Sequence, residues 1–352
     1  MKYQTDMLYK VLIDEVDPQQ WLQYAGMFSD YSIYQTWAYQ EIRAKTDKQQ
    51  LSRIVIKDKD NDIVLISHVR IKQIMPLGLK IGYMQMGPLM LNRDGTSRCR
   101  VEALKILRQE YLKTRVDVLR IVPNIFKNNE NQRFIEMLEM SGFQRCPYFA
   151  PYHTLILPLG CSSETLRKGL HQKWRKKLRK AEKAGVEIVE KSDNDAFELL
   201  DNFYYKLCQR KKFKCEKTEI FSKSQSALSD SEKMSPVVVC LNGEPVAVHL
   251  TSNLGDTAIA LLVAASDQGY SCWSSYLAWW KALTISNERG MKKYDFGGID
   301  FEKNPSVSRF KAGMGGEEQF HIGAFDAFKS SVTRNAFRIG EKIYKGIRNF
   351  DR

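Results

Sequence analysis

PVVVCLNGEPVAVHL, Pro236–Leu250, decides the fold class of this chain. Two apolar runs flank Asn242-Gly243, a residue pair that strongly indicates a tight turn between antiparallel strands. The stretch RIVIKDKDNDIVLISHV, Arg53–Val69, has the same form, with a turn of Asp, Lys and Asn. Both stretches are predicted β-hairpins, and they can be aligned with a short gap at the turn.

Each predicted hairpin is followed by a helix and a strand. In the first half these are a helix over 96–113 and a strand over 118–122. In the second half a further strand over 257–266 comes first, and then a helix over 273–289 and a strand over 292–296. Because the order hairpin, helix, strand occurs twice, we predict an α+β fold built from a duplicated unit.

The length of the chain also favours two domains. A chain of 352 residues exceeds the usual size of one domain, and 43% hydrophobic residues are enough for real cores. We expect the boundary near residue 150, with a first domain at 1–150 and a second at 151–352. The second domain would include a basic helix at the C-terminus.

The cysteines, the histidines and the first residues of the sequence limit the class of protein that this chain can belong to. Seven cysteines without CxxC spacing argue against a disulfide framework, and five histidines show no metal-binding spacing. We therefore expect no metal site. The polar opening MKYQTDMLYK and the short apolar run 258–265 indicate neither a secretory signal nor a membrane span. The expectation is a reduced, cytoplasmic protein.

A net charge of +13 suggests a phosphate-rich partner such as RNA, a nucleotide or an anionic membrane face. About half of this excess lies between Glu164 and Lys191, where a helix ending at Gly185 is predicted. Its apolar stripe comprises Leu166, Leu170, Trp174, Leu178 and Ala181. The other face is either solvated or contacts phosphate, with Lys173, Arg175 and Lys176 as candidate contacts to phosphate or tRNA.

The C-terminal segment is predicted to be a basic amphipathic helix. Its apolar positions are Phe325, Phe328, Val332, Ala336, Ile339, Ile343 and Ile347, and its basic ones include Lys329, Arg334, Arg338, Lys342, Lys345 and Arg348. Such a helix can lie on an anionic membrane, which would be a peripheral contact. The interpretation that we favour is that the apolar stripe packs on its own domain.

The order of elements suggests the GNAT acyltransferase fold. Ordinary GNAT enzymes hold the coenzyme A pyrophosphate in a Q/R-x-x-G-x-G/A loop before the helix, using backbone N–H groups. The corresponding stretch here, DQGYSCWSS at 267–275, lacks this spacing. We therefore expect that coenzyme A is not bound in the ordinary manner, and we expect no other cofactor.

Several further motifs, spread over both halves, together resemble one family. They are YQTWAYQEI (34–42), GPLM (87–90), VLRIVP (118–123), KWRKKLRKAEKAGVEI (173–188), YKLCQRKKF (205–213) and YDFGGID…VSRFKAGMGGE (294–317). The chain resembles the Fem family (FemA/FemB/FemX) of tandem-GNAT aminoacyltransferases and their FemAB-like relatives. The resemblance implies two tandem GNAT-like domains, each with a mostly antiparallel sheet flanked by helices.

The resemblance also implies a reaction. Such enzymes move an aminoacyl group from aminoacyl-tRNA to an amine of a peptidoglycan precursor, forming an amide. This chemistry needs a positioned amine, an activated carbonyl and a group that stabilises the oxyanion. By the family's F-K motif, Lys311 would be the catalytic residue, although a surface lysine beside a turn is the alternative. Arg210 would grip phosphate oxygens of the precursor, or else lie at a solvated helix end.

Other substrate contacts follow from the same resemblance. Candidate substrate-binding residues beside Arg210 are Trp37, Tyr39, Gly297, Gly298, Arg309 and Phe310, with Phe310 expected on a strand and pointing into the core. Tyr39 stands where FemX-like members place a phosphate-binding lysine, and Val122 where an aspartate is common. Lys45 or Lys48 could substitute for that lysine. These departures leave the acceptor open.

Three functions compete. The first is a FemX-like transferase that uses aminoacyl-tRNA and a phosphate-bearing cell-envelope precursor. The second is a FemAB-like N-acyltransferase that uses acyl-CoA or acyl carrier protein on an amino sugar or lipid of the envelope or an exopolysaccharide. The third is a non-catalytic RNA- or membrane-binding protein, and it ranks last because no dedicated nucleic-acid module is visible. The expected place is the cytoplasm, at or near the inner membrane face. Donor, acceptor and oligomeric state are not identified by the sequence.

Overall fold

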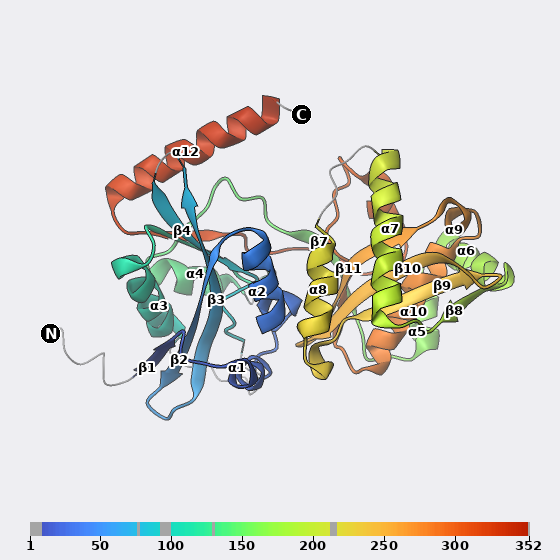
Figure 1. Ribbon diagram of the computed structural model, residues 1–352, viewed down its shortest axis with the longest axis horizontal. Coiled ribbons are helices and arrows are strands. Elements are labelled where there is room, and N and C mark those ends of the chain that lie inside the picture. The colour runs from blue at the N-terminus through green and yellow to red at the C-terminus, as the bar shows by residue number, and fades with distance from the viewer. Residues whose placement is uncertain (1–8, 76–77, 92–99, 129–130, 212–216, 351–352) are drawn as a thin grey trace. The chain divides into compact units, whose positions relative to one another are not determined.

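The computed structural model describes residues 9–75, 78–91, 100–128, 131–211 and 217–350. They form two compact units. The first unit consists of two segments, the chain up to Tyr152 and the chain from Phe320 onward, and the second unit is His153–Gln319. Each unit contains a seven-stranded sheet flanked by helices (Figure 1), which confirms the predicted α+β class. None of the helices in these described ranges combines the length and apolar character needed to cross a membrane.

The sheet of the first unit has the strand order β1-β2-β3-β4-β5-β14-β6. Its strands are β1 (Tyr9–Ile13), β2 (Gln50–Asp58), β3 (Ile63–Ile74), β4 (Leu79–Gln85), β5 (Val118–Val122), β6 (Gln144–Arg145) and β14 (Phe325–Phe328). Its helices are α1 (Pro18–Ala25), η1 (Ile33–Gln35), α2 (Trp37–Thr46), α3 (Arg100–Thr114), α4 (Gln132–Met140) and α12 (Ser331–Phe350). The apolar core lies between the sheet and helices α3 and α4, with α1 and α2 on the other face (Figure 1). The predicted start of α3 at Thr96 lies outside the described residues.

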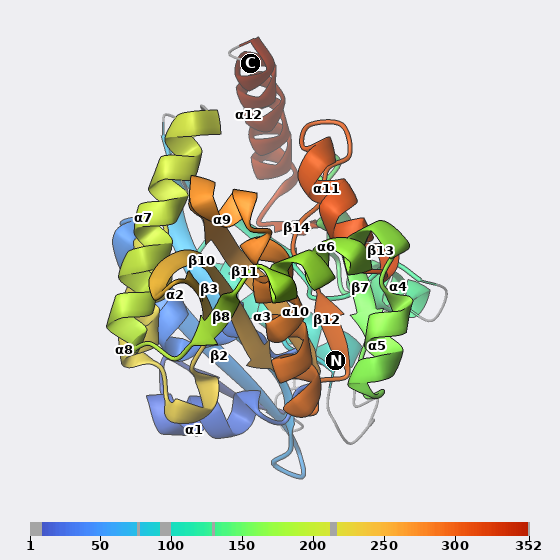
Figure 2. The ribbon, with the colours of Figure 1, turned by 90° about the vertical axis from the view of Figure 1, so that its right-hand side faces the viewer.

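The sheet of the second unit has the order β13-β7-β12-β11-β10-β9-β8. Its strands are β7 (His153–Pro158), β8 (Val186–Val189), β9 (Ser235–Leu241), β10 (Glu244–Leu254), β11 (Thr257–Ala265), β12 (Lys293–Asp295) and β13 (Glu317–Phe320). Its helices are α5 (Ser163–Gly169), α6 (Gln172–Lys183), α7 (Asp193–Lys211), α8 (Glu219–Ala227), η2 (Asp230–Glu232), α9 (Asp267–Ser271), α10 (Ser274–Glu288) and α11 (Pro305–Ala312). Helices α6 and α10 cover one face of this sheet, and α7 covers the other (Figures 1 and 2).

The two sheets repeat one pattern. In each, three antiparallel strands lead through a helix to a strand that pairs in parallel with the third: β2-β3-β4-α3-β5 and β9-β10-β11-α10-β12. This confirms the predicted duplication. The sequence prediction missed β4, whose run is interrupted by Lys80 and Gly82. Gly82 lies at a tightly packed position, because a Cβ there would be 3.0 Å from Val69 Cγ1 and 3.1 Å from Leu119 Cδ1.

The C-terminal segment corrects the predicted domain limits. Strand β14 pairs with β5, with Asp326 opposite Arg120, so the chain from Phe320 onward belongs to the first unit. The second domain therefore does not extend to residue 352. Phe325 and Phe328 lie on this strand, and the helix begins only at Ser331. A four-residue strand next to a helix cannot be separated from it by apolar spacing alone.

The predicted basic helix of the second unit is also two helices. Leu170 has an extended backbone (ψ 142°), which ends α5 before α6 begins. The amide of His171 donates to the carbonyl of Gly313, so this break is stabilised by a contact distant in sequence. Gly185 adopts the left-handed conformation after α6, with φ of 74°, as predicted. All five residues of the predicted stripe are buried: Leu166, Leu170, Trp174, Leu178 and Ala181.

Candidate functional site

Lys311 lies on helix α11, together with Phe310. The prediction that Phe310 lies on a strand is therefore wrong. The helix begins at Pro305, whose fixed φ suits the first helical position, and ends before Gly313. This pairing of proline and glycine is a helix signal that the sequence prediction did not use.

The Nζ of Lys311 donates a hydrogen bond to the carbonyl of Gly298 over 2.9 Å. The turn after β12 that presents this carbonyl needs a glycine at Gly297, which has φ of 76°. A Cβ there would lie 2.9 Å from the carbonyl oxygen of Ala260 and 3.4 Å from Lys311 Nζ. In the predicted Gly297-Gly298 pair, Gly298 therefore accepts the hydrogen bond of Lys311, and Gly297 leaves room for its ammonium.

Asp295, which the sequence analysis did not single out, stabilises this turn by hydrogen bonds. Its buried Oδ1 accepts from the Gly297 amide at 2.8 Å and from the hydroxyl of Thr154. Burial lowers the pKa of Lys311 to about 8, and the negative charge of Asp295 opposes that lowering. The carboxylate thus shapes the turn and keeps the ammonium charged near neutral pH. The feature of the sequence that could have indicated this role is the position of Asp295 at the end of a predicted strand, two residues before the Gly297-Gly298 turn.

A cavity of about 480 Å³ opens beside Lys311 within the second unit. Most of its walls are aromatic or aliphatic, and its lining includes Tyr270, Trp273, Tyr276, Trp279, Phe296, Val307 and Phe310. Phe310 packs on the rings of Trp174, Tyr276 and Trp279, with centroid distances of 5.8, 4.8 and 6.0 Å. The ring cluster holds α11, and therefore Lys311, against the rest of the unit.

The cavity follows an edge of strand β11. Parallel pairing between β11 and β12 covers Thr257 to Ile259, and residues 260–265 of β11 line the cavity beyond that point. On the other side, Ala260 and residues 262–265 pair antiparallel with β10, and the register shifts by one residue at Leu261. Backbone N–H and C=O groups at such an edge can pair with an extended substrate.

Arg210 lies at the other end of this region. A second hollow of about 310 Å³ is lined by Phe203, Lys206, Leu207, Arg210 and Ala265 to Asp267, and it shares Leu207 and Ala265 with the larger cavity. The guanidinium of Arg210 stacks on Tyr270 at 4.6 Å and pairs with Asp267. Since the side chains of this pair are 43% and 87% exposed, phosphate oxygens could replace the aspartate at little cost.

The stretch 267–275 forms α9 and the start of α10. Gly269 lies there for packing, because a Cβ would come within 2.2 Å of the carbonyl oxygen of Val246. Trp273 has a left-handed backbone, with φ of 58°, and its ring lies 4.9 Å from the Nζ of Lys180. The one glycine of this stretch thus allows α9 to pack closely against β10.

The three residues of α6 that were predicted to contact phosphate differ in their surroundings. Lys173 and Lys176 are exposed, whereas Arg175 donates to the carbonyl of Lys168 at 2.9 Å. Lys177, which the prediction omitted, lines the cavity, and its Nζ lies 5.5 Å from the ring of Tyr276. The signal for Lys177 was its position four residues after Lys173, on the same side of the helix.

The remaining predicted substrate contacts are not among the residues that line this cavity. Trp37 and Tyr39 are on α2 of the first unit and do not line the cavity around Lys311. The guanidinium of Arg53 lies 3.2 Å from the ring of Trp37. Tyr39 is buried, which raises the pKa of its hydroxyl. Arg309 is exposed on α11 and also lies outside the cavity lining, and Lys45 and Lys48 are exposed in the first unit.

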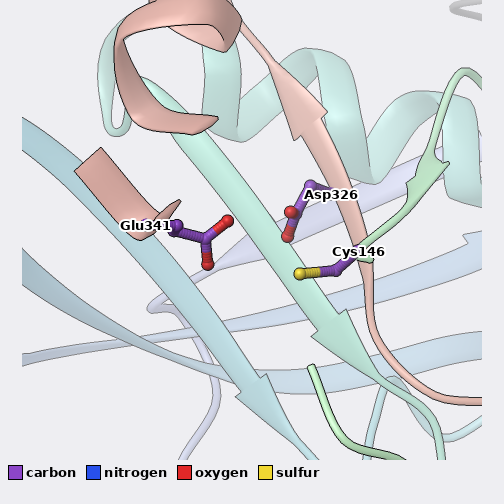
Figure 3. Close-up of side chains that lie close together, drawn as sticks. All are labelled: Cys146, Asp326 and Glu341. Carbon is purple, nitrogen blue, oxygen red and sulfur yellow. The ribbon is translucent and has the colours of Figure 1, made fainter. Parts of the chain in front are cut away.

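Three potential metal ligands, Cys146, Asp326 and Glu341, lie close together in the first unit (Figure 3). The Nη2 of Arg120 occupies the space among them, 3.2 Å from the sulfur, 2.9 Å from Asp326 and 2.6 Å from Glu341. Arg338 adds contacts to Asp326 at 3.1 Å and Glu341 at 3.3 Å. The two arginines balance the two carboxylates, so this is an ion-pair network that joins α12 to the sheet.

Comparison with known proteins agrees with this architecture. A family model described as an acetyltransferase (GNAT) domain matches residues 168–312, a range that contains Arg210 and Lys311. No curated protein matches the sequence significantly.

Among solved structures, one titled as FemX is similar, with a TM-score of 0.80 and 14% identity over 94% of this chain and 100% of that chain. A tandem GNAT protein from the clavulanic acid biosynthesis pathway has a TM-score of 0.50, with 12% identity over 92% and 99%. The C-terminal domain of a putative lysylphosphatidylglycerol synthetase from Agrobacterium fabrum has a TM-score of 0.53, with 9% identity over 92% and 94%. The chain therefore has the tandem GNAT fold of FemX, which confirms at the level of fold the resemblance seen in its sequence.

Proposed function

We propose that the chain is a Fem-type acyltransferase that transfers an aminoacyl group from aminoacyl-tRNA to an amine of a peptidoglycan or other cell-envelope precursor. The observation that carries this proposal is the position of Lys311. Its ammonium is anchored to Gly298 at one end of an aromatic cavity, inside the segment matched by the GNAT model. Because charged tRNA and nucleotide-linked precursors are made in the cytoplasm, the proposal places the protein there.

The proposed step forms one amide and breaks one ester. The acceptor amine attacks the ester carbonyl of the donor, giving a tetrahedral oxyanion. A Lys311 N–H donates to this oxyanion, as a preorganised hydrogen-bond donor does in an oxyanion hole. The ester C–O bond then breaks, the leaving alkoxide takes up the proton that the amine releases, and the products are an amide and an alcohol.

The arginine end supports a phosphate-bearing substrate. Lys206 and Arg210 both line the smaller hollow, which adjoins the cavity, since Leu207 and Ala265 line both. An arginine fork and a lysine are suited to phosphate oxygens. The substrate's phosphates would bind here while its reacting group extends along the edge of β11 toward Lys311.

A second candidate is an N-acyltransferase that uses acyl-CoA or acyl carrier protein, acting on an amino sugar or a lipid. One observation favours it: the described residues that line the cavity include two lysines, Lys177 and Lys311, and no carboxylate. An aminoacyl group carries an ammonium that would have to rely on aromatic faces there, whereas an uncharged acyl chain would not.

A donor competition distinguishes the two. Purified protein is incubated with cell-envelope extract and either charged tRNA or a pool of acyl-CoA, and mass spectrometry follows loss of donor and gain of mass on the acceptor. We expect consumption of charged tRNA by the wild type and a large loss of this consumption in Lys311→Met. Consumption of acyl-CoA alone would establish the second candidate, and consumption of neither donor would contradict both.

A further inference from the structure

Helix α12 presents an apolar stripe to solvent. Val332, Ile339 and Ile343 are 77%, 60% and 58% exposed. Their spacings of seven and four residues place them on one face of the helix. The predicted packing of this stripe on its own domain is therefore wrong for these three residues. Ile347, Lys345 and Arg348 of the predicted helix have side chains that lie outside the described part of the chain.

The opposite side of the helix holds it to the first unit. Phe337 is buried, with its ring 6.0 Å from that of Phe328. Arg338 donates to the carbonyl of Arg145 at 3.1 Å, and Glu341 accepts from Arg120 at 2.6 Å. Phe337, Arg338 and Glu341 thus face the protein, whereas the apolar stripe of Val332, Ile339 and Ile343 faces away. Turning the helix to bury the stripe would break these ion pairs.

Charge indicates what covers the stripe. From Ser331 to Phe350 the helix contains five Lys or Arg residues and one Glu, a net charge of +4. Lys342 is exposed on the turn between Ile339 and Ile343. Its ammonium can reach lipid phosphates while neighbouring isoleucines enter the acyl region. A neutral or cationic protein partner would gain nothing from this excess of positive charge.

From this arrangement we propose that α12 binds the surface of an anionic bilayer, lying in the plane of the headgroups with Val332, Ile339 and Ile343 inserted. The ion-pair network of Arg120, Asp326, Arg338 and Glu341 fixes the helix so that this face points outward. The inference concerns the first unit alone and does not depend on the reaction proposed for the second. It gives the chain a binding surface for lipid headgroups.

The test is sedimentation with sucrose-loaded vesicles of phosphatidylcholine, with or without one-third phosphatidylglycerol. The wild type is expected to sediment with the anionic vesicles, and the bound fraction should fall as salt rises. The triple variant Val332→Gln, Ile339→Gln and Ile343→Gln should lower the partition coefficient at least tenfold, because glutamine keeps helix propensity while removing apolar contact. Lys342→Glu should lower it several-fold.

Met140→Gln is the matched control, since Met140 is an exposed apolar residue on α4 of the same unit. It should bind vesicles as the wild type does, and circular dichroism should show that all variants are folded. Equal binding by the wild type and the triple variant would overturn the proposal. So would a wild-type dimer in light scattering that the triple variant loses while neither binds vesicles, because a second copy would then cover the stripe.

Discussion

The ammonium of Lys311 donates to the carbonyl of Gly298 across 2.9 Å, joining helix α11 to the turn that follows β12. This bond uses one of the three protons of the ammonium and leaves two for a substrate in the adjoining cavity. The same bond holds the charge in one place before any substrate binds. A preorganised donor of this kind stabilises developing negative charge without reorganising during the reaction.

Replacing Lys311 with methionine keeps the length of the side chain and removes the charge. If the ammonium acts on the oxyanion, kcat should fall about a hundredfold or more, roughly 3 kcal/mol of transition-state stabilisation, with a smaller change in KM. Steady-state kinetics with whichever donor is consumed in the donor competition would measure both constants. Lys303→Met, which removes an exposed lysine shortly before α11, is the control and should retain activity. A Lys311→Met enzyme with unchanged turnover would make Lys311 a structural residue only.

The lowered pKa of Lys311 also predicts a pH dependence of stability. Its pKa is about 8 in the folded protein and about 10.5 when unperturbed, so between these values the unfolded chain binds a proton that the folded chain does not. Stability contributed by this group therefore rises with pH across that window and is constant below it. Denaturant unfolding of the wild type and Lys311→Met at several pH values would measure the difference. Parallel stability curves for the two proteins would show that Lys311 is solvated in solution.

The repeated unit could be predicted from sequence because hairpins and long helices leave local signals. Asn242-Gly243 marks a turn, and both residues have positive φ in the structure, as that type of turn requires. Strand β14 has no such signal. Its place is set by pairing with β5, about two hundred residues earlier, and four residues of apolar spacing cannot reveal a partner so distant.

The candidate site likewise has residues that the sequence predicts and residues whose role only the folded structure shows. Lys311 and the Gly297-Gly298 turn were predicted from a family motif, which a single sequence can show because these residues lie within fifteen positions of one another. The role of Asp295 depends on hydrogen bonds from Thr154 and Gly297, and Lys177 matters because α6 packs beside α10. Both relationships arise from tertiary packing, which no pattern in a single sequence records.

Asp295→Asn should separate the two contributions of this carboxylate. The amide oxygen can still accept from Gly297, but the negative charge that raises the pKa of Lys311 is lost. The alkaline limb of kcat/KM, expected near pH 8 in the wild type, should therefore move to lower pH. Asp295→Ala should instead lower kcat at every pH, because the turn loses its acceptor.

Asp256→Asn, which removes a carboxylate paired with Lys292 on the same unit, is the control and should leave the profile unchanged. An Asp295→Asn enzyme with a wild-type limb would refute electrostatic coupling between Asp295 and Lys311. The pH profile distinguishes this from a purely structural defect, which would lower activity without moving the limb.

Arg210 and Asp267 make opposite predictions for a phosphate-bearing substrate. Removing the guanidinium in Arg210→Ala should raise KM roughly tenfold with little change in kcat, about 1.4 kcal/mol for one charge-assisted contact. Asp267→Asn should leave KM equal or lower it, because the carboxylate that pairs with Arg210 no longer competes with phosphate. The difference between wild type and Arg210→Ala should shrink as salt is raised, since both side chains are partly exposed. Kinetics at low and high ionic strength would measure this, and a KM for Arg210→Ala equal to that of the wild type at low salt would exclude Arg210 from phosphate binding.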